Sequence, residues 1–181
     1  MPFNIIVCVK QVFDTSYSIQ IQEDPKLILQ KGRALPAYII NPADKCAMEE
    51  ALRIKQQVSS KIIVLSLGPD TASLGFNYFL ARGADQIIHL CHSSDYIPDS
   101  YSTSRLLSNE INLHDYDLIF CGDKSIDHAG GLVGPVLAEF LDLPQITRAG
   151  QCELLTSEIG PDSDYQLRAH RFLERGDRQV I

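Results

Sequence analysis

Four short, almost continuously apolar runs constrain the fold of this chain more than any other feature of its sequence. They cover residues 4–9, 61–67, 85–90 and 117–121, are rich in Ile, Val and Leu, and are bounded by Gly, Pro or polar residues. A strand that is covered on both faces is apolar throughout, whereas a strand with one solvent face alternates apolar and polar side chains. The four runs therefore predict strands of a buried parallel sheet.

Helical patterns lie between these runs. Asn41 suits the cap of the first helix and Pro42 its first turn. Further helices are predicted over residues 70–83 and 100–112, and after Gly131 as far as Pro144. Strands that alternate with helices indicate an α/β fold with a doubly wound, mostly parallel sheet and helices on both faces.

Two segments interrupt this alternation. Residues 18–22 and 27–29 predict a hairpin inserted between the first strand and its helix. Residues 152–155 and 165–172, with a turn signal at 160–162, predict a small C-terminal β-hairpin. We therefore expect an α/β domain over residues 1–150 and a C-terminal hairpin or edge segment over residues 151–181.

Composition excludes several classes of protein. A net charge of −7 argues against a nucleic-acid coat or a polybasic membrane anchor. No apolar stretch approaches the roughly 20 residues that span a bilayer, and no signal peptide is visible. The cysteines are odd in number and lack a C-x-x-C pair, which favours reduced thiols in a cytoplasmic protein: Cys8, Cys46, Cys91, Cys121 and Cys152.

Ligands of open α/β sheets bind beyond the carboxyl ends of the strands. Candidate positions are therefore Lys10 and Gln11, residues 66–69, and the glycine-bearing loop at residues 122–134. Backbone amides in such a loop, and the helix that follows it, can hold an anion. The loop matches neither a Walker A nor a G-x-G-x-x-G pattern, so phosphate binding and a plain tight turn both remain open.

Other clusters have weaker support. His, Cys and His at residues 89–92 resemble zinc donors, but no fourth ligand is nearby in sequence. Ser, Asp and His at residues 125–128 lack the nucleophile elbow of a hydrolase. A solvated strand face is favoured over a nucleic-acid site for four arginines: Arg168, Arg171, Arg175 and Arg178.

Several motifs, in order, resemble those of electron-transfer flavoprotein β subunits. They begin with NIIVCVKQVFDT at residues 4–15 and INPAD at residues 40–44. They continue through residues 47–55, 65–69, 81–85, 117–122, 125–127 and 133–135, and cover nearly the whole chain.

The resemblance implies an electron-carrier subunit that is not itself an enzyme. Such subunits pair with an α subunit that carries the redox FAD, accept electrons through transient contact with dehydrogenases, and bind AMP or a second FAD. Carried over by motif, this adenine nucleotide would lie against Cys8, Asn41, Ser66, Leu67, Gly68, Gly122, Asp127, Gly130, Gly131, Val133 and Gly134. No residue is expected to be catalytic, and neither a metal site nor insertion into a membrane is expected.

The chain departs from the family pattern at two places. The family has an Asp or Asn, a Thr and a Gln between the matches of Asp127 and Val133, where this chain has HAGGL. Backbone amides at Gly130 and Gly131 would then hold the phosphate. The family also continues beyond the position of Ile181, so a truncated or divergent member is expected. A stand-alone nucleotide-binding or sensing domain, and a structural partner whose loop is empty, remain alternatives.

Overall fold

The computed structural model of the chain describes residues 2–21, 28–30, 37–93, 97–156, 165–173 and 177–181. The turn predicted at residues 160–162, residues 22 and 27 of the predicted inserted hairpin, and Arg175 lie outside the described residues.

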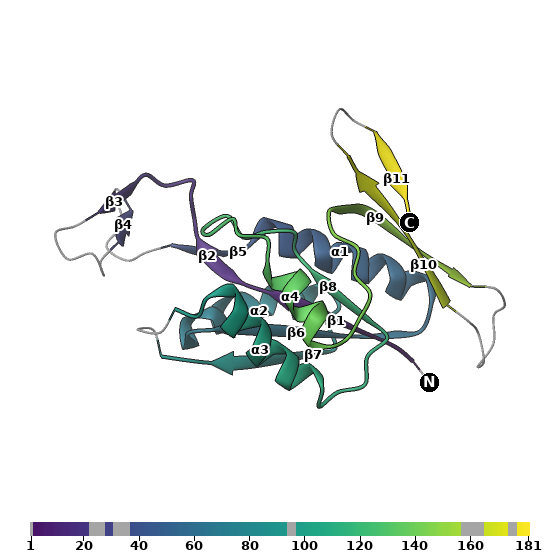
Figure 1. The fold of residues 1–181 in the computed structure, drawn as a ribbon. Helices are drawn as coiled ribbons and strands as arrows, with labels where there is room; N and C mark the ends of the chain where they lie inside the picture. The colour runs from purple at the N-terminus through teal and green to yellow at the C-terminus, as the bar shows by residue number, and fades with distance from the viewer. Residues whose placement is uncertain (1, 22–27, 31–36, 94–96, 157–164, 174–176) are drawn as a thin grey trace.

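A parallel four-stranded sheet forms the centre of the fold (Figure 1). Its strands, in the order β7-β6-β1-β8, are β7 (Gln86–Cys91), β6 (Ser60–Gly68), β1 (Phe3–Val9) and β8 (Leu118–Cys121). All three pairings are parallel, so the strands expected from the apolar runs are confirmed.

Helices cover both faces of this sheet, as expected for a doubly wound fold. Helices α1 (Pro42–Gln57) and α2 (Phe76–Arg82) pack on one face, with Met48, Ile54 and Phe79 in its core. Helices α3 (Ser100–Ile111) and α4 (Val133–Phe140) pack on the other, with Leu107, Ile111 and Leu137 in its core.

Strand β1 shows why the apolar runs form buried strands. Ile5 and Val7 pack toward α1, while Ile6 and Cys8 pack toward α3 and α4. Successive side chains of a strand point to opposite faces, so only an unbroken apolar run fills both layers. Full burial of one such aliphatic side chain contributes about 1.5–3 kcal/mol.

The helix expected over residues 70–83 is divided into two parts. A 3₁₀ turn, η1 (Asp70–Gly75), precedes α2, which ends at Gly83 with a φ of 118°. Gly75 disfavours a continuous helix, and the Ser73 hydroxyl donates a hydrogen bond to the Asp70 carbonyl. The prediction of one unbroken helix was therefore wrong over residues 70–75, which form a 3₁₀ helix.

Two short antiparallel pairs lie between β1 and α1. Strands β3 (Ile19–Ile21) and β4 (Ile28–Gln30) pair as the predicted inserted hairpin, which projects away from the sheet (Figure 1). Strands β2 (Gln11–Phe13) and β5 (Tyr38–Ile40) form a ribbon at its base that the sequence did not predict. This ribbon returns the chain to the end of β1, where α1 begins.

The predicted C-terminal hairpin is confirmed and extended by a third strand. Strands β9 (Ala149–Thr156), β10 (Tyr165–Phe172) and β11 (Arg178–Val180) form an antiparallel sheet in the order β11-β10-β9. It joins the larger domain through the Cys152 amide, which donates to Glu50 of α1, and through edge-to-face packing of Tyr165 on Phe3.

The strand order places a topological switch point between β1 and β8. The chain runs from β1 to β6 and β7 on one side, then crosses back to β8 on the other side of β1. Connections leaving β1 and β8 therefore diverge to opposite faces and open a crevice at the carboxyl ends of these strands.

Substitution Ile5→Ala tests the two-sided core. Ile5 is fully buried in the central strand, so loss of its side chain is expected to lower the free energy of unfolding by about 2–5 kcal/mol. The midpoint of urea unfolding measures the change. Ile97→Ala, at a 75% exposed position, is the control and should change it by less than about 0.5 kcal/mol.

Candidate functional site

Three chain segments meet at the carboxyl edge of the sheet. They are Lys10, directly after β1; residues 41–44, at the start of α1; and the loop from Gly122 to Leu132, between β8 and α4. The backbone N–H of Asn41 donates a hydrogen bond to the Lys10 carbonyl at 2.9 Å, and this bond joins the first two segments. Side chains of Asn41 and Asp44 connect them to the third.

Asn41 holds the loop instead of capping α1. Its side chain makes no capping hydrogen bond to the helix. Instead, Nδ2 donates to Asp44 Oδ1 at 3.0 Å and to the Lys124 carbonyl at 3.1 Å, while Oδ1 accepts from the Ile126 amide at 3.2 Å. Asn41 therefore occupies the N-cap position expected from the sequence, but its side chain does not cap the helix, because this buried amide has partners more than 80 residues away in the chain.

Asp44 lies beneath the same loop, with only 5% of its surface exposed. Its Oδ2 accepts from the Lys10 amide at 2.7 Å, and its Oδ1 accepts from Asn41. Burial raises the pKa of Asp44 to about 6, and the charge of Asp127 adds to the shift. Hydrogen bonds from Asn41 and the Lys10 amide, and the charge of Lys10, oppose it.

Gly122 allows β8 to approach the start of α1 closely. A Cβ atom at this position would lie 2.1 Å from Asp44 Oδ1 and 2.9 Å from the Ala43 carbonyl carbon. Any larger residue would push the loop away from α1 or displace the Asp44 carboxyl.

An ion pair closes the outer side of the site. Lys10 Nζ lies 2.7 Å from Asp127 Oδ2 and 3.2 Å from His128 Nδ1. Burial opposes ionisation of Asp127, but hydrogen bonds from Lys10 and Ser125 and the charge of Lys10 lower its pKa to about 2. The Asp127 carboxylate thus stays ionised at neutral pH and orients the Lys10 ammonium group beside His128.

The rest of the loop is shaped by its backbone. Ala129 and Gly131 have left-handed φ values of 53° and 62°. The buried Ser104 hydroxyl, from α3, lies 2.7 Å from the Ser100 carbonyl oxygen and 3.0 Å from the Val133 carbonyl oxygen, and so links α3 to the first turn of α4. Gly130 and Gly131 are exposed just before this helix, where backbone amides and the helix dipole favour an anion.

Cys8 and Leu67 lie on the α3/α4 side of the sheet, next to the loop. Cys8 is the register partner of Cys121, and both belong to the apolar cluster on this face, against which Leu67 and Val133 also pack. The hydrogen bond with Cys121 and burial raise the pKa of Cys8 well above its ordinary value. Cys8 is therefore a buried, protonated thiol and not a nucleophile.

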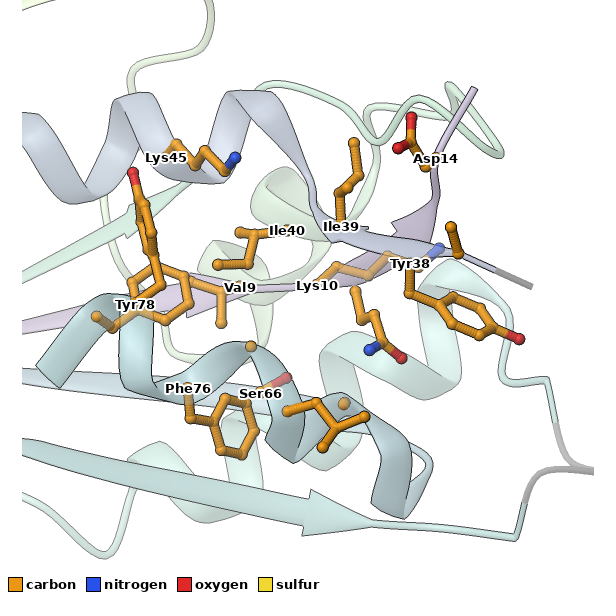
Figure 2. A pocket seen from close by; sticks show the side chains of 16 residues that line it. Val9, Lys10, Asp14, Tyr38, Ile39, Ile40, Lys45, Ser66, Phe76 and Tyr78 are labelled. Atoms are coloured by element: carbon orange, nitrogen blue, oxygen red, sulfur yellow. The ribbon is translucent and has the colours of Figure 1, made fainter. Parts of the chain in front are cut away.

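Ser66 points to the opposite face of the sheet from Leu67, because successive residues of β6 alternate. It lines a pocket of about 550 Å³ between the β2–β5 ribbon and η1 and α2 (Figure 2). Lys45 and Tyr78 lie together at one end, with Lys45 Nζ 5.3 Å from the ring centroid, and Asp14 and Tyr38 lie toward the other.

The structure thus divides the eleven expected nucleotide residues. Asn41 and Asp127 belong to one network of polar contacts through Asp44 and Lys10, and Gly122 packs closely against Asp44. Cys8 and Leu67 border this network on the α3/α4 side. Gly130, Gly131, Val133 and Gly134 form the loop end and the first turn of α4. Ser66 lines the separate pocket, and Gly68, at the end of β6, accepts hydrogen bonds from His89 and the His92 amide.

Sequence reasoning missed Asp44 and undervalued Lys10. Asp44 was visible only as an acidic residue in the first turn of a helix, a common surface feature that favours the helix dipole. One sequence signal for Asp44 did exist. Gly122 directly follows β8, and the absence of a side chain there leaves room for the buried Asp44 carboxyl of α1.

The weaker clusters occupy other places. His89 contacts the Gly68 carbonyl and His92 contacts the Ser93 carbonyl, and no group of three possible metal ligands occurs among the described residues. Arg171 donates to Thr147, and the Arg178 guanidinium lies over the Phe172 ring. In the described part of the chain, no helix is long and apolar enough to cross a membrane.

Substitution Gly122→Ala tests the close approach of β8 to α1. The added methyl group is expected to cost about 1–3 kcal/mol of unfolding free energy through overpacking. The comparison variant is Gly134→Ala, whose Cβ would meet nothing nearer than 3.5 Å and which should be neutral or stabilising. Equal destabilisation by both substitutions in urea would contradict the packing described.

Substitution Lys10→Met tests the electrostatics. Loss of the ammonium group is expected to raise the pKa of Asp127 from about 2 toward 3.8 and to raise the pKa of Asp44 above about 6. Stability from Asp127 is present above pH 3.8 and lost as pH falls toward 2, whereas Asp44 contributes stability below pH 3.8 that is lost as pH rises through 6. Carboxyl-carbon NMR titration measures both values, with Lys124→Met as control.

Comparison with known proteins identifies a family of similar sequences. A family model described as the electron transfer flavoprotein domain matches residues 33–177. The chain is 40% identical over 151 residues to electron transfer flavoprotein subunit beta of Thermoanaerobacterium thermosaccharolyticum, which covers 83% of this chain and 56% of the relative. Over 167 residues it is 31% identical to the subunit of the same name from Bacillus subtilis, covering 90% and 62%.

A third relative carries a different name. The acryloyl-CoA reductase electron transfer subunit gamma of Anaerotignum propionicum is 37% identical over 146 residues, which covers 79% of this chain and 53% of the relative. The chain therefore spans little more than half the length of the curated relatives it matches. The domain match and these relatives show that the chain belongs to the electron transfer flavoprotein family and resembles its β subunits.

Proposed function

We propose that this chain is a β-like subunit of an electron-transfer flavoprotein. It binds an adenine nucleotide at the carboxyl edge of the sheet and pairs with an FAD-carrying α subunit, which passes on electrons taken from dehydrogenases. In this role the chain is an electron-carrier subunit without bond chemistry of its own, and its contribution is to bind the nucleotide and position the partner.

The convergence of Asn41, Asp44 and the β8–α4 loop is the observation that carries this proposal. The three meet at the switch point between β1 and β8, where open α/β sheets bind their ligands. The loop then runs into the N-terminus of α4, which suits a phosphate.

The phosphate and the adenine ring of a nucleotide each have a suitable neighbour at this edge. Backbone amides of Gly130 and Gly131 and the first turn of α4 would hold the phosphate, with Lys10 and His128 as the adjacent basic side chains. The half-buried Leu67 offers an apolar surface for the adenine ring, and the buried Cys8 belongs to the same apolar cluster. These groups suit AMP and the AMP half of FAD equally well.

The two parts of the chain have different roles in this proposal. We assign nucleotide binding to residues 1–150 and contact with a partner to the C-terminal sheet. Apolar side chains exposed on or beside this sheet support such a contact: Tyr165, Phe172, Leu173, Val180 and Ile181. The five free cysteines suit a reducing compartment such as the cytoplasm.

Co-expression with a family α subunit tests the proposal. The expected product is a yellow heterodimer that releases AMP or FAD from the β-like chain on denaturation, identified by chromatography and absorbance. Asn41→Ala should leave the pairing intact and reduce nucleotide affinity about tenfold, because the loop loses its buried hydrogen bonds. Asn77→Ala, on the exposed side of α2, is the matched control.

Other outcomes favour the alternatives. A colourless monomer that releases an adenine nucleotide would indicate a stand-alone binding or sensing domain. A nucleotide-free chain that still pairs tightly would indicate a structural partner and contradict the nucleotide site.

A further inference from the structure

The Asp44 carboxyl group is placed to control the proposed nucleotide site without touching its ligand. It is 5% exposed and lies below the loop, and its two oxygens accept from different segments: Oδ2 from the Lys10 amide and Oδ1 from Asn41 Nδ2. Any effect on a ligand must therefore pass through these neighbours.

Asp44 is one of three groups that fix which way the Asn41 side-chain amide faces. Asn41 Nδ2 has two acceptors, Asp44 Oδ1 and the Lys124 carbonyl, while its Oδ1 has one donor, the Ile126 amide. A rotation of 180° would turn the amide oxygen toward the carboxylate oxygen of Asp44 and the amide nitrogen toward the Ile126 N–H. The carboxylate thus favours the observed orientation, together with the Lys124 carbonyl and the Ile126 amide.

That orientation shapes the loop. The two loop groups held by Asn41, the carbonyl of Lys124 and the amide of Ile126, come directly before Asp127 and the glycines. If the Asn41 amide were free to rotate, both hydrogen bonds would be lost together. The path of the backbone toward α4 would then lose its connection to α1.

Charged groups around Asp44 determine when the carboxylate form is present. The Lys10 ammonium group favours it, whereas Asp127 in the loop opposes it, with His128 next to Asp127, and the neighbouring Cys8 is a neutral thiol. Protonation would place an O–H donor where the Lys10 amide or Asn41 Nδ2 already donates. One of the two hydrogen bonds would then break.

We propose that Asp44 is the positioning residue of this site: as a buried carboxylate it orients the Asn41 amide, which holds the β8–α4 loop in its binding conformation. Protonation at Oδ1, the oxygen that accepts from Asn41, therefore loosens the hold of Asn41 on the loop. The consequence for ligand binding rests on the proposed nucleotide function, whereas the consequence for the loop does not.

Substitution Asp44→Asn tests the mechanism without a ligand. The variant keeps the shape of the side chain, but its amide cannot accept from both donors. Hydrogen exchange of the free chain at pH 7.5 should show about tenfold less protection of the Ile126 amide, and a similar loss at the Lys10 amide. Unchanged protection at Ile126 would overturn the proposal.

Asp117→Asn is the matched control for that experiment. Asp117 accepts from the Asn4 amide at 2.7 Å, the same distance as in the Asp44–Lys10 pair, but at the opposite edge of the sheet. It should reduce protection at Asn4 and leave Ile126 unchanged. Loss of protection at Ile126 in both variants would indicate general destabilisation and overturn the specific role of Asp44.

A pH series on the wild-type chain needs no substitution. Protection of Ile126, corrected for the intrinsic exchange rate, should fall as pH decreases through about 6, while that of core amides such as Val64 stays constant. The decrease should be absent in Asp44→Asn. A decrease that persists in this variant would assign the effect to another group and overturn the proposal.

Ligand titration with AMP then separates the two proposals. In chains that bind AMP, Asp44→Asn should weaken binding about tenfold, and should add nothing in an Asn41→Ala background because both act through one amide. Independent, additive effects would overturn the positioning role. If the wild-type chain binds neither AMP nor FAD, the proposed function fails, while the exchange results still decide the role of Asp44.

Discussion

Burial of β1 on both faces is the constraint on which the rest of this structure depends. Ile5 and Val7 require a helical layer on one side, and Ile6 and Cys8 require another on the opposite side. Two layers of helices demand crossover connections, so neighbouring strands run parallel and all their carboxyl ends lie at one edge. The candidate site follows from this geometry, because the segments that leave β1 and β8, and the start of α1, meet at that edge.

At three strand ends, an Asp carboxylate accepts a hydrogen bond from a backbone amide, but the effect on the pKa of the carboxyl group differs. At the amino edge, Asp117 accepts from the Asn4 amide and Asp85 accepts from the Ile62 amide, each at 2.7 Å. Hydrogen bonds and the charge of Lys55 outweigh burial and lower the pKa of Asp85, whereas burial raises the pKa of Asp44 at the carboxyl edge. A carboxylate that is kept ionised at neutral pH despite burial opposes stability, and such groups concentrate at functional sites.

The path of the β8–α4 loop is set largely by its backbone. Left-handed backbone at Ala129 and Gly131, and the Ser104 hydroxyl on the Val133 carbonyl, give this stretch a defined path. The alternation of β6 also separates two environments, because Leu67 borders the loop while Ser66 lines the pocket beside the β2–β5 ribbon. At the carboxyl edge, one face of the sheet therefore borders the glycine loop. The other face borders the pocket, which aromatic side chains such as Tyr38 and Tyr78 line.

The amino-acid sequence by itself determined the fold class and the positions of the main elements. Apolar runs such as residues 61–67, and the cap and turn signals between them, are local patterns, so they can be recognised in a single sequence. The family resemblance and the glycine loop likewise followed from residue order. Only the tertiary structure decided the strand order, the division of residues 70–83 into η1 and α2, and the network of Asp44. Asn41 looked like a helix cap because its true partners, Lys124 and Ile126, are distant in sequence, and no local pattern encodes which segments a folded sheet brings together.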